Sequence, residues 1–332
     1  MRIAVDAMGS DNYPSPDVEG AVQAARMYSD EILLVGDRET VETELKKHDI
    51  LGLKITIVHA SEIVEMTDKP SVVGKTKPDS SMHIGMNLVK DGEAQAFVTA
   101  GNTGAALTIA MLYTLHRIPA VKRPALSSII RVHGNYVTMV DIGANTDSKP
   151  EWMVQFALMG DIYARKALKL ERPRVALLSN GEEKGKGNQA IQETYEILQA
   201  YTHLNFVGNI EPKDILNGKG DVVVSDGFIG NITVKSFEAF GSALSGLIRS
   251  ELKRDPISAM GGLLARRAFA RVSRQIDPFE IGGAPLLGVN GVVIIGHGRS
   301  NAQAIRNAIN QARLAVSGDI VQSIRDDLIV SR

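Results

Sequence analysis

Apolar and polar positions along this 332-residue chain follow two alternating patterns. Short runs rich in Val and Ile predict buried β-strands, and longer segments with apolar residues every three or four positions predict helices. The strand-like segments are Arg2–Asp6, Ile32–Gly36, Lys54–His59, Ala96–Ala100, Leu126–Val132, Val137–Asp141, Arg174–Ser179, Asn205–Gly208, Asp221–Ser225 and Gly291–Gly296. The helix-like segments are Asp17–Tyr28, Glu39–His48, Met82–Asp91, Thr103–Leu115, Glu151–Leu168, Asn188–Ala200, Ile232–Lys253 and Asn301–Ser317.

This alternation predicts an α/β fold, with a mainly parallel sheet that carries helices on both faces. The sequence shows no internal repeat and no low-complexity linker. We therefore expect residues 1–332 to form a single α/β domain.

The segment Ser225–Asn231 combines a polar turn with two glycines between a strand-like run and a long helical pattern. In open α/β sheets, ligands bind where strands end and helices begin, because backbone N–H groups converge there. Asp226 and Asn231 flank the glycines, so we expect both to face a ligand. The alternative is an ordinary turn in which Asp226 accepts backbone hydrogen bonds.

Similar polar turns follow several other strand-like segments. They are Asp6–Asp11, Thr99–Gly104, Asp141–Asp147, Ser179–Asn188 and Gly296–Asn301. Each is weak evidence alone, and none is a Walker loop or a G-x-G-x-x-G motif. Together they predict an extended polar cleft at the sheet edge that holds an anion on backbone amides.

The composition narrows the chemistry. The 37 basic and 38 acidic residues nearly balance, so no overall field favours nucleic acid. The chain has no cysteine, which removes disulfides, thiolate metal sites and a cysteine nucleophile. The amino-terminal residues lack a signal-peptide pattern, and no apolar stretch is long enough to span a bilayer.

Candidate reactive side chains are few. Lys184 and Lys186 lie in a glycine-flanked turn and could offer a cation to phosphate or to an oxyanion. The seven histidines show no metal-ligand spacing, and only His297, between two glycines, is expected near a ligand. The segment Lys69–Met82 holds three lysines with Pro70, Gly74 and Pro78, and it is interpreted as a mobile basic loop or an inert surface loop.

A basic and apolar segment lies at about 253–276 and is expected to protrude as a helical element. Ile257, Met260, Leu263 and Leu264 flank an apolar turn at Gly261-Gly262, and a helix with an arginine face follows. The expected surface residues are Leu263, Leu264, Arg266, Arg267, Arg271 and Arg274. The segment could be a solvated helix on the body, an interfacial membrane helix or a dock for an acidic partner.

These motifs together resemble the PlsX family of bacterial phosphate acyltransferases over nearly the whole chain. The matching stretches are IAVDAMGSD at Ile3–Asp11, SSM at Ser80–Met82, TAGNTGA at Thr99–Ala105, RPAL at Arg123–Leu126, DIGAN at Asp141–Asn145, QFALMG at Gln155–Gly160, GEEKGKGN at Gly181–Asn188, DVVVSDGFIGN at Asp221–Asn231, and GGAPLLGVNG to GHGRSNA at Gly282–Ala302. Departures from the family pattern occur at Ser10, at Ser225, at Glu238–Phe240 and in the loop Val73–Pro78.

The resemblance implies a fold similar to the isocitrate and isopropylmalate dehydrogenases and a homodimer. It implies synthesis of acyl phosphate from acyl-acyl carrier protein and inorganic phosphate. The acyl phosphate would supply the acyl group for glycerol-3-phosphate acylation in phospholipid synthesis. The expected partners are acyl carrier protein, a membrane glycerol-3-phosphate acyltransferase and an anionic membrane surface. The expected location is cytoplasmic and peripherally membrane-associated, with no cofactor, no metal and no nucleic acid.

The reaction needs a place for a multiply charged anion and a donor where negative charge develops. We expect Lys186 to be the catalytic cation, Asn231 a neutral donor and Asp226 a residue that orients Lys186 or phosphate. The expected phosphate- and substrate-binding residues are Asp6, Gly101, Asn102, Thr103, Gly104, Asp141, Asn145, Gly227, Gly230 and His297.

Two other functions remain open. A decarboxylating NAD-dependent dehydrogenase would share the implied fold, but it needs clustered aspartates for a divalent metal. A membrane-bound scaffold could bind acyl carrier protein without turnover. Cofactor binding would reveal the first, and phosphate-dependent release of free carrier protein would exclude the second.

Overall fold

The computed structural model describes residues 1–132, 134–276 and 278–330, without the side chains of 270, 273–276, 278, 329 and 330. One eleven-stranded sheet runs through the body, in the order β3-β2-β1-β4-β11-β10-β5-β6-β9-β7-β8. The strands are β1 (Arg2–Asp6), β2 (Glu31–Gly36), β3 (Ile55–His59), β4 (Ala96–Thr99), β5 (Ala125–Val132), β6 (Asn135–Val140), β7 (Arg174–Leu178), β8 (Asn205–Ile210), β9 (Val222–Val224), β10 (Ala284–Leu287) and β11 (Val292–Ile295).

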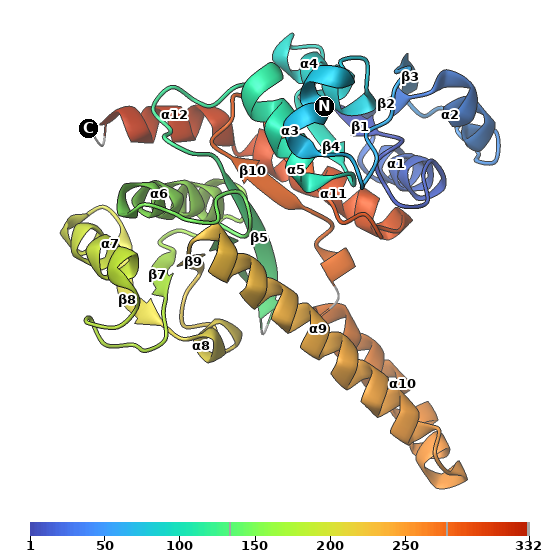
Figure 1. The fold of residues 1–332 in the computed structure, drawn as a ribbon. Coiled ribbons are helices and arrows are strands. Elements are labelled where there is room, and N and C mark those ends of the chain that lie inside the picture. Colours follow the sequence, from blue (N-terminus) through green and yellow to red (C-terminus); the bar gives the residue numbers. More distant parts are fainter. Residues whose placement is uncertain (133, 277, 331–332) are drawn as a thin grey trace.

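The helices cover this sheet and extend beyond it (Figure 1). They are α1 (Ser15–Tyr28), α2 (Arg38–Leu45), α3 (Pro70–Thr76), α4 (Ser81–Lys90), α5 (Thr103–Thr108), α6 (Pro150–Lys166), α7 (Gln189–Ala200), α8 (Pro212–Leu216), α9 (Gly227–Leu252), α10 (Pro256–Ile276), α11 (Ala302–Ser317) and α12 (Ile320–Val330). A π-helical turn at Ile109–Tyr113 continues α5, and a 3-10 turn occupies Pro278–Glu280.

The sheet consists of two parallel blocks joined by antiparallel strands. Strands β3, β2, β1, β4 and β11 are parallel to one another, and so are β6, β9, β7 and β8. Between them, β10 pairs antiparallel with β11 and β5, and β5 pairs antiparallel with β6. The prediction of a mainly parallel sheet is therefore confirmed.

Alternating side chains place helices on both faces, because successive strand residues point to opposite sides. In β1, Ile3 and Val5 join the core cluster formed with α1 and α11, whereas Ala4 joins the cluster formed with α4 and α5. In β9, Val222 and Val224 face α6, while Val223 belongs to a third cluster with Ile215 of α8. Both faces are buried, which explains why these strands are apolar at nearly every position.

Several elements differ from the sequence prediction. The segment predicted as a loop at Lys69–Met82 contains α3, because Pro70 occupies the first helical turn and Val73 is buried. The chain at Gly74 passes so close to Tyr113 that a Cβ there would lie 2.5 Å from the ring. Helix α9 begins at Gly227, five residues before the predicted start, and the short elements β10, α8 and α12 were not predicted.

Helices α9 and α10 form a long antiparallel hairpin that projects away from the sheet (Figure 1). Gly262 faces α9, and a Cβ there would lie 3.3 Å from Leu252. The apolar residues predicted as a turn at 257–264 instead lie in the first turns of α10, because Pro256 begins the helix. Among the helices that the structure describes, none combines the length and the hydropathy needed to cross a bilayer.

Candidate functional site

A pocket of about 680 Å³ lies where loops from both parallel blocks meet. The loops after β1, β4, β6 and β11 contribute to its wall, together with β5 and one face of α9. Its lining residues are Asp11, Met66, Gly101, Thr103, Gly104, Leu107, Leu126, Ser128, Ile129, Ile142, Gly143, Ala144, Asn231, Val234, Lys235, Glu238, Phe279, Ile281–Ala284 and Ile295–Gly298. Gly101, Thr103, Gly104, Asn231 and His297 are the predicted site residues that line this pocket.

The amino-terminal turn of α9 packs directly on the β6–α6 loop. Asp226 caps the helix, and its Oδ1 accepts a hydrogen bond of 2.7 Å from the backbone of Ile229. A Cβ at Gly227 would lie 2.6 Å from the carbonyl oxygen of Asn145, and one at Gly230 would lie 1.9 Å from that of Asp141. The two glycines are therefore required by helix–loop packing, and the same contact brings Asn231 to the pocket.

The Asp141 carboxylate organises the β6–α6 loop. It is fully buried and accepts five hydrogen bonds, from the backbone N–H groups of Leu126, Gly143, Ala144 and Asn145 and from the side-chain amide of Asn145. Burial raises the pKa of Asp141, although these donors oppose the shift. The structure thus places Asp141 and Asn145 behind the pocket wall, where they hold the loop in shape.

Asp6 has a similar place in the first block. Its buried carboxylate accepts hydrogen bonds from the backbone of Met8 at 3.0 Å and from the Thr99 hydroxyl at 2.7 Å. The Thr99 oxygen accepts a hydrogen bond of 3.0 Å from the backbone of Gly101, which lines the pocket. Asp6 therefore connects to the pocket through Thr99, and burial raises its pKa.

Asn102 holds together two segments beside the pocket. Its Oδ1 caps α5 by accepting a hydrogen bond of 3.0 Å from the backbone of Ala105. Its Nδ2 donates hydrogen bonds of 3.1 Å to the carbonyl oxygens of Met66 and Asp68. Asn102 thus fixes the 65–68 segment against the β4–α5 loop, and Met66 forms part of the pocket wall.

The two candidate lysines lie on the β7–α7 loop. Neither is among the residues that line the pocket. Lys184 pairs with Glu196 at 3.0 Å and donates to Gln199, so its ammonium faces α7. The Lys186 side chain is exposed, and its stem runs over Gly181, where a Cβ would lie 2.8 Å from Cγ of Lys186. The structure therefore separates this loop from the pocket lining but leaves Lys186 exposed to solvent.

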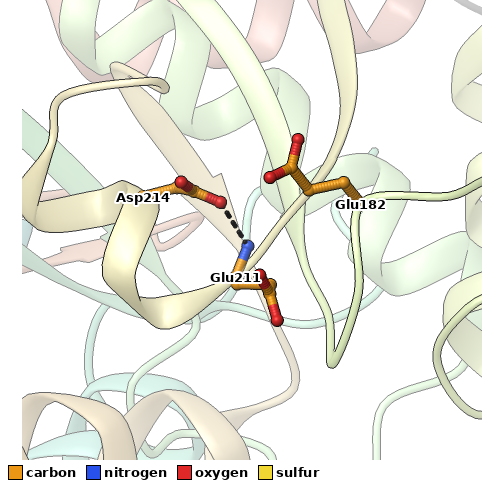
Figure 2. Close-up of side chains that lie close together, drawn as sticks. All are labelled: Glu182, Glu211 and Asp214. Atoms are coloured by element: carbon orange, nitrogen blue, oxygen red, sulfur yellow. Dashed lines mark hydrogen bonds between the residues drawn. The ribbon is translucent and has the colours of Figure 1, made fainter.

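Three carboxylates gather beside the same loop, as Figure 2 shows for Glu182, Glu211 and Asp214. Asp214 accepts a hydrogen bond of 3.0 Å from the backbone of Glu211, within the capping box of α8. Lys219 lies 3.0 Å from Glu182 and 2.9 Å from Asp214, and Lys213 pairs with Glu211. Each of the three carboxylates is thus paired with one of these two lysines, so we assign the cluster a structural role.

The sequence interpretation did not identify Ser128, Lys235 or Glu238 as pocket residues. Ser128 comes from β5, whose neighbours in the sheet could not be inferred from local sequence. The signal for Lys235 was present, since it follows Asn231 by four residues and therefore shares its face of a helix.

Comparison with known proteins agrees with the expected fold and family. The family model described as "Fatty acid synthesis protein" matches residues 1–323. A phosphate acyltransferase from Geotalea daltonii is 45% identical over 331 residues, covering 98% of this chain and 95% of that protein. One from Nitratidesulfovibrio vulgaris is 46% identical over 310 residues, covering 93% of this chain and 90% of that protein.

Solved structures with low sequence identity share the fold. A phosphotransacetylase from Streptococcus pyogenes matches with a TM-score of 0.58 at 18% identity, covering 98% of this chain and 94% of that one. A 4-hydroxythreonine-4-phosphate dehydrogenase from Klebsiella pneumoniae matches with a TM-score of 0.51 at 13% identity, covering 95% and 99%. The expected dehydrogenase-like fold is confirmed. By the family match and these relatives, the chain belongs to the fatty acid synthesis protein family that contains the phosphate acyltransferases.

Proposed function

We propose that this chain is a phosphate acyltransferase that transfers an acyl group from acyl carrier protein to inorganic phosphate. The product, an acyl phosphate, would supply acylation of glycerol-3-phosphate in phospholipid synthesis. Support comes from the relatives named phosphate acyltransferase, which match nearly the full length of the chain. The observation that carries the proposal within the structure is the pocket, which places polar and apolar surfaces side by side.

The pocket chemistry suits both substrates. Its volume of about 680 Å³ lies in the range of small-molecule sites. Ile129, Ile142, Val234 and Ile281 give it apolar walls for a pantetheine arm or an acyl chain. Asn231, the hydroxyl of Ser128 and the glycine-rich loop after β4 supply polar groups for an anion.

The reaction requires no covalent enzyme intermediate. A phosphate oxygen attacks the thioester carbonyl carbon, the C–O bond forms, and the negative charge moves to the carbonyl oxygen. The C–S bond then breaks, and the pantetheine thiolate takes up the proton that phosphate loses. Pre-positioned donors lower the barrier by meeting the developing charge.

Three side chains are proposed for these tasks. Lys186 is the proposed oxyanion cation. Asn231 is the proposed neutral donor, and its Nδ2 already donates a hydrogen bond of 2.9 Å to the carbonyl oxygen of Ile142, which fixes the amide at the pocket wall. Asp226 is the proposed orienting group, with one carboxylate oxygen used by the helix cap.

The α9–α10 hairpin is the proposed attachment surface for an anionic membrane. In α10, Ile257, Leu263 and Leu264 are 81%, 68% and 83% exposed, and Arg266, Arg267 and Arg271 are also exposed. Arg274 belongs to the same helix, but its side chain lies outside the described residues. Peripheral attachment at this hairpin would bring the acyl phosphate to a membrane glycerol-3-phosphate acyltransferase. A homodimer is part of the same proposal.

The decisive experiment is a mass-spectrometric assay with acyl-acyl carrier protein and inorganic phosphate. We expect acyl phosphate and free carrier protein to form together, and only when phosphate is present. A scaffold would bind the carrier protein without releasing it, and that result would refute the proposed activity. Binding of NAD with saturation would instead favour the dehydrogenase alternative.

A further inference from the structure

We propose that Lys235 of α9 is the cation that binds inorganic phosphate inside the pocket. The inference rests on the proposed acyl transfer to phosphate and adds a residue to it. Among the described residues that line the pocket, Lys235 is the only lysine or arginine. A phosphate ion carries between one and two negative charges near neutral pH, so a site that holds it beside a thioester needs a cation at close range.

The position of Lys235 follows from the packing of α9. Asn231 and Lys235 are four residues apart and therefore lie one above the other on the same helix face. The Asn231 amide is held against the β6–α6 loop by its hydrogen bond of 2.9 Å to Ile142. Gly230, the residue before Asn231, packs against the carbonyl oxygen of Asp141, and this contact sets the distance between the helix and the loop. The same contacts thus direct both polar side chains to the pocket.

The charges around Lys235 leave it available to a ligand. Glu238, one turn further along α9, pairs with Arg299 at 3.8 Å instead of with Lys235. Arg299 also stacks on the ring of Phe279 at 5.7 Å, which keeps it beside Glu238. Within the described residues, Lys235 has no ion-pair partner. Asp11 and His297 also line the pocket, from the loops after β1 and β11.

The apolar walls strengthen this assignment. Val234, Ile142 and Ile281 line the same pocket as Asn231 and Lys235. A ligand that fills the space displaces water from these walls, and an ion pair is stronger where water is excluded. Lys235 would hold phosphate beside Asn231, while the oxyanion of the thioester is left to a separate donor such as Lys186.

The test compares Lys235→Met, which removes the charge at similar length, with Lys235→Arg, which keeps a cation. Lys90→Met serves as a control, because Lys90 is an exposed lysine in the last turn of α4. Two readouts are needed: the phosphate KM in the acyl-acyl carrier protein assay, and the rise in Tm caused by inorganic phosphate alone.

We expect Lys235→Met to raise the phosphate KM roughly 10- to 100-fold, the range for losing a charge-assisted contact. It should also abolish the phosphate-dependent rise in Tm while leaving the Tm without phosphate unchanged. Lys235→Arg should recover much of both effects, and Lys90→Met should behave like the wild type. A Lys235→Met variant with normal phosphate KM and a normal phosphate-dependent Tm would overturn the inference.

The two readouts also separate this inference from the proposed function. If the wild type forms no acyl phosphate, the proposed function fails, and the phosphate-dependent Tm alone decides the role of Lys235. If phosphate then fails to raise the Tm of the wild type, the assignment of Lys235 is overturned. A stabilisation that disappears only in Lys235→Met supports a phosphate site at this lysine whatever the reaction is.

Discussion

Two buried aspartates, Asp6 and Asp141, hold the loops of the site through hydrogen bonds inside the fold. Asp6 reaches the pocket through Thr99, and Asp141 gathers the N–H groups of its own loop. Each is fully buried, so each carboxylate must find donors within the fold. Side chains of this kind shape a site from behind, and their loss would be felt as a change in loop geometry.

Asp17 gives this buried chemistry a measurable pH dependence. Burial raises its pKa from 3.8 to about 8, and the nearby Asp6 adds to the shift, although Ser10 donates a hydrogen bond of 2.5 Å to Oδ2. The folded protein therefore keeps the proton between about pH 4 and pH 8, whereas the unfolded chain releases it. Since the folded state binds more protons, stability falls as pH rises through this window, by about 1.4 kcal/mol per unit.

We therefore expect Asp17→Asn to be more stable than the wild type near pH 8 and to lose this slope. The amide can still accept the hydrogen bond from Ser10. Denaturant unfolding at several pH values between 4 and 8 measures the difference, with the exposed Asp91→Asn as a control. Parallel pH profiles for the wild type and Asp17→Asn would show that Asp17 is ionised in the folded protein.

Lys186 is the side chain that we predict to act in catalysis. Removing one oxyanion donor typically costs roughly 10²–10³ in rate. We expect Lys186→Ala to lower turnover by that order with an unchanged Tm, because its side chain is exposed and carries no ion pair within the described residues. Steady-state kinetics of Lys186→Ala and Lys184→Ala decide between the two lysines. Near-normal turnover of Lys186→Ala would transfer the catalytic role elsewhere, first to Lys184.

At the scale of single elements, α9 is the helix on which the site depends. Its first turn touches the β6–α6 loop, its next turns line the pocket, and its far half forms the protruding hairpin. A shift of this helix would therefore change the pocket and the hairpin together.

Two glycines of α9 make this dependence testable. Gly230→Ala would place a Cβ 1.9 Å from the carbonyl oxygen of Asp141, so overpacking should cost roughly 1–3 kcal/mol of stability or more. A Cβ at Gly246 would meet no described atom within 4 Å outside its own stretch of helix, so Gly246→Ala should gain roughly 0.5–1 kcal/mol from helix propensity. Chemical denaturation measures both. Equal effects at the two positions would mean that the first turn of α9 does not pack on the loop as described.

We predict that the first turns of α10 attach the protein to an anionic membrane. Leu263→Glu combined with Leu264→Glu should release the protein from anionic vesicles, because both leucines would enter the headgroup boundary beside Arg266 and Arg267. Turnover on soluble acyl carrier protein should be unchanged. Leu51→Glu is the control, since Leu51 is 92% exposed outside the hairpin. If vesicle binding persists and the KM for carrier protein rises, the hairpin docks the protein partner instead.

We predict that the protein assembles as a homodimer. Phe240 and Leu247 of α9 are 70% and 64% exposed, and a second chain would remove such apolar surface from water. We expect light scattering at micromolar concentration to give about twice the chain mass of 35.8 kDa. A single-chain mass that does not change with concentration would contradict the homodimer.

Much of the architecture is encoded locally. Continuous β-branched runs such as Val222–Val224, bounded by turn residues, are typical of strands buried between two helical layers, and longer segments show the helical period in the sequence itself. Polar glycine turns after these strands indicated a site at their carboxyl ends. The family motifs added the fold and the chemistry, since they span nearly the whole chain.

The composition of the pocket was decided by tertiary structure. Strand order is a property of long-range pairing, so the chain itself does not reveal that the loops after β4, β6 and β11 share one cavity while the β7–α7 loop does not line it. Capping by Asp226 and the close contact of Gly230 set the start and position of α9. That placement brings Lys235 to the pocket, because which face of a helix is buried depends on what packs against it.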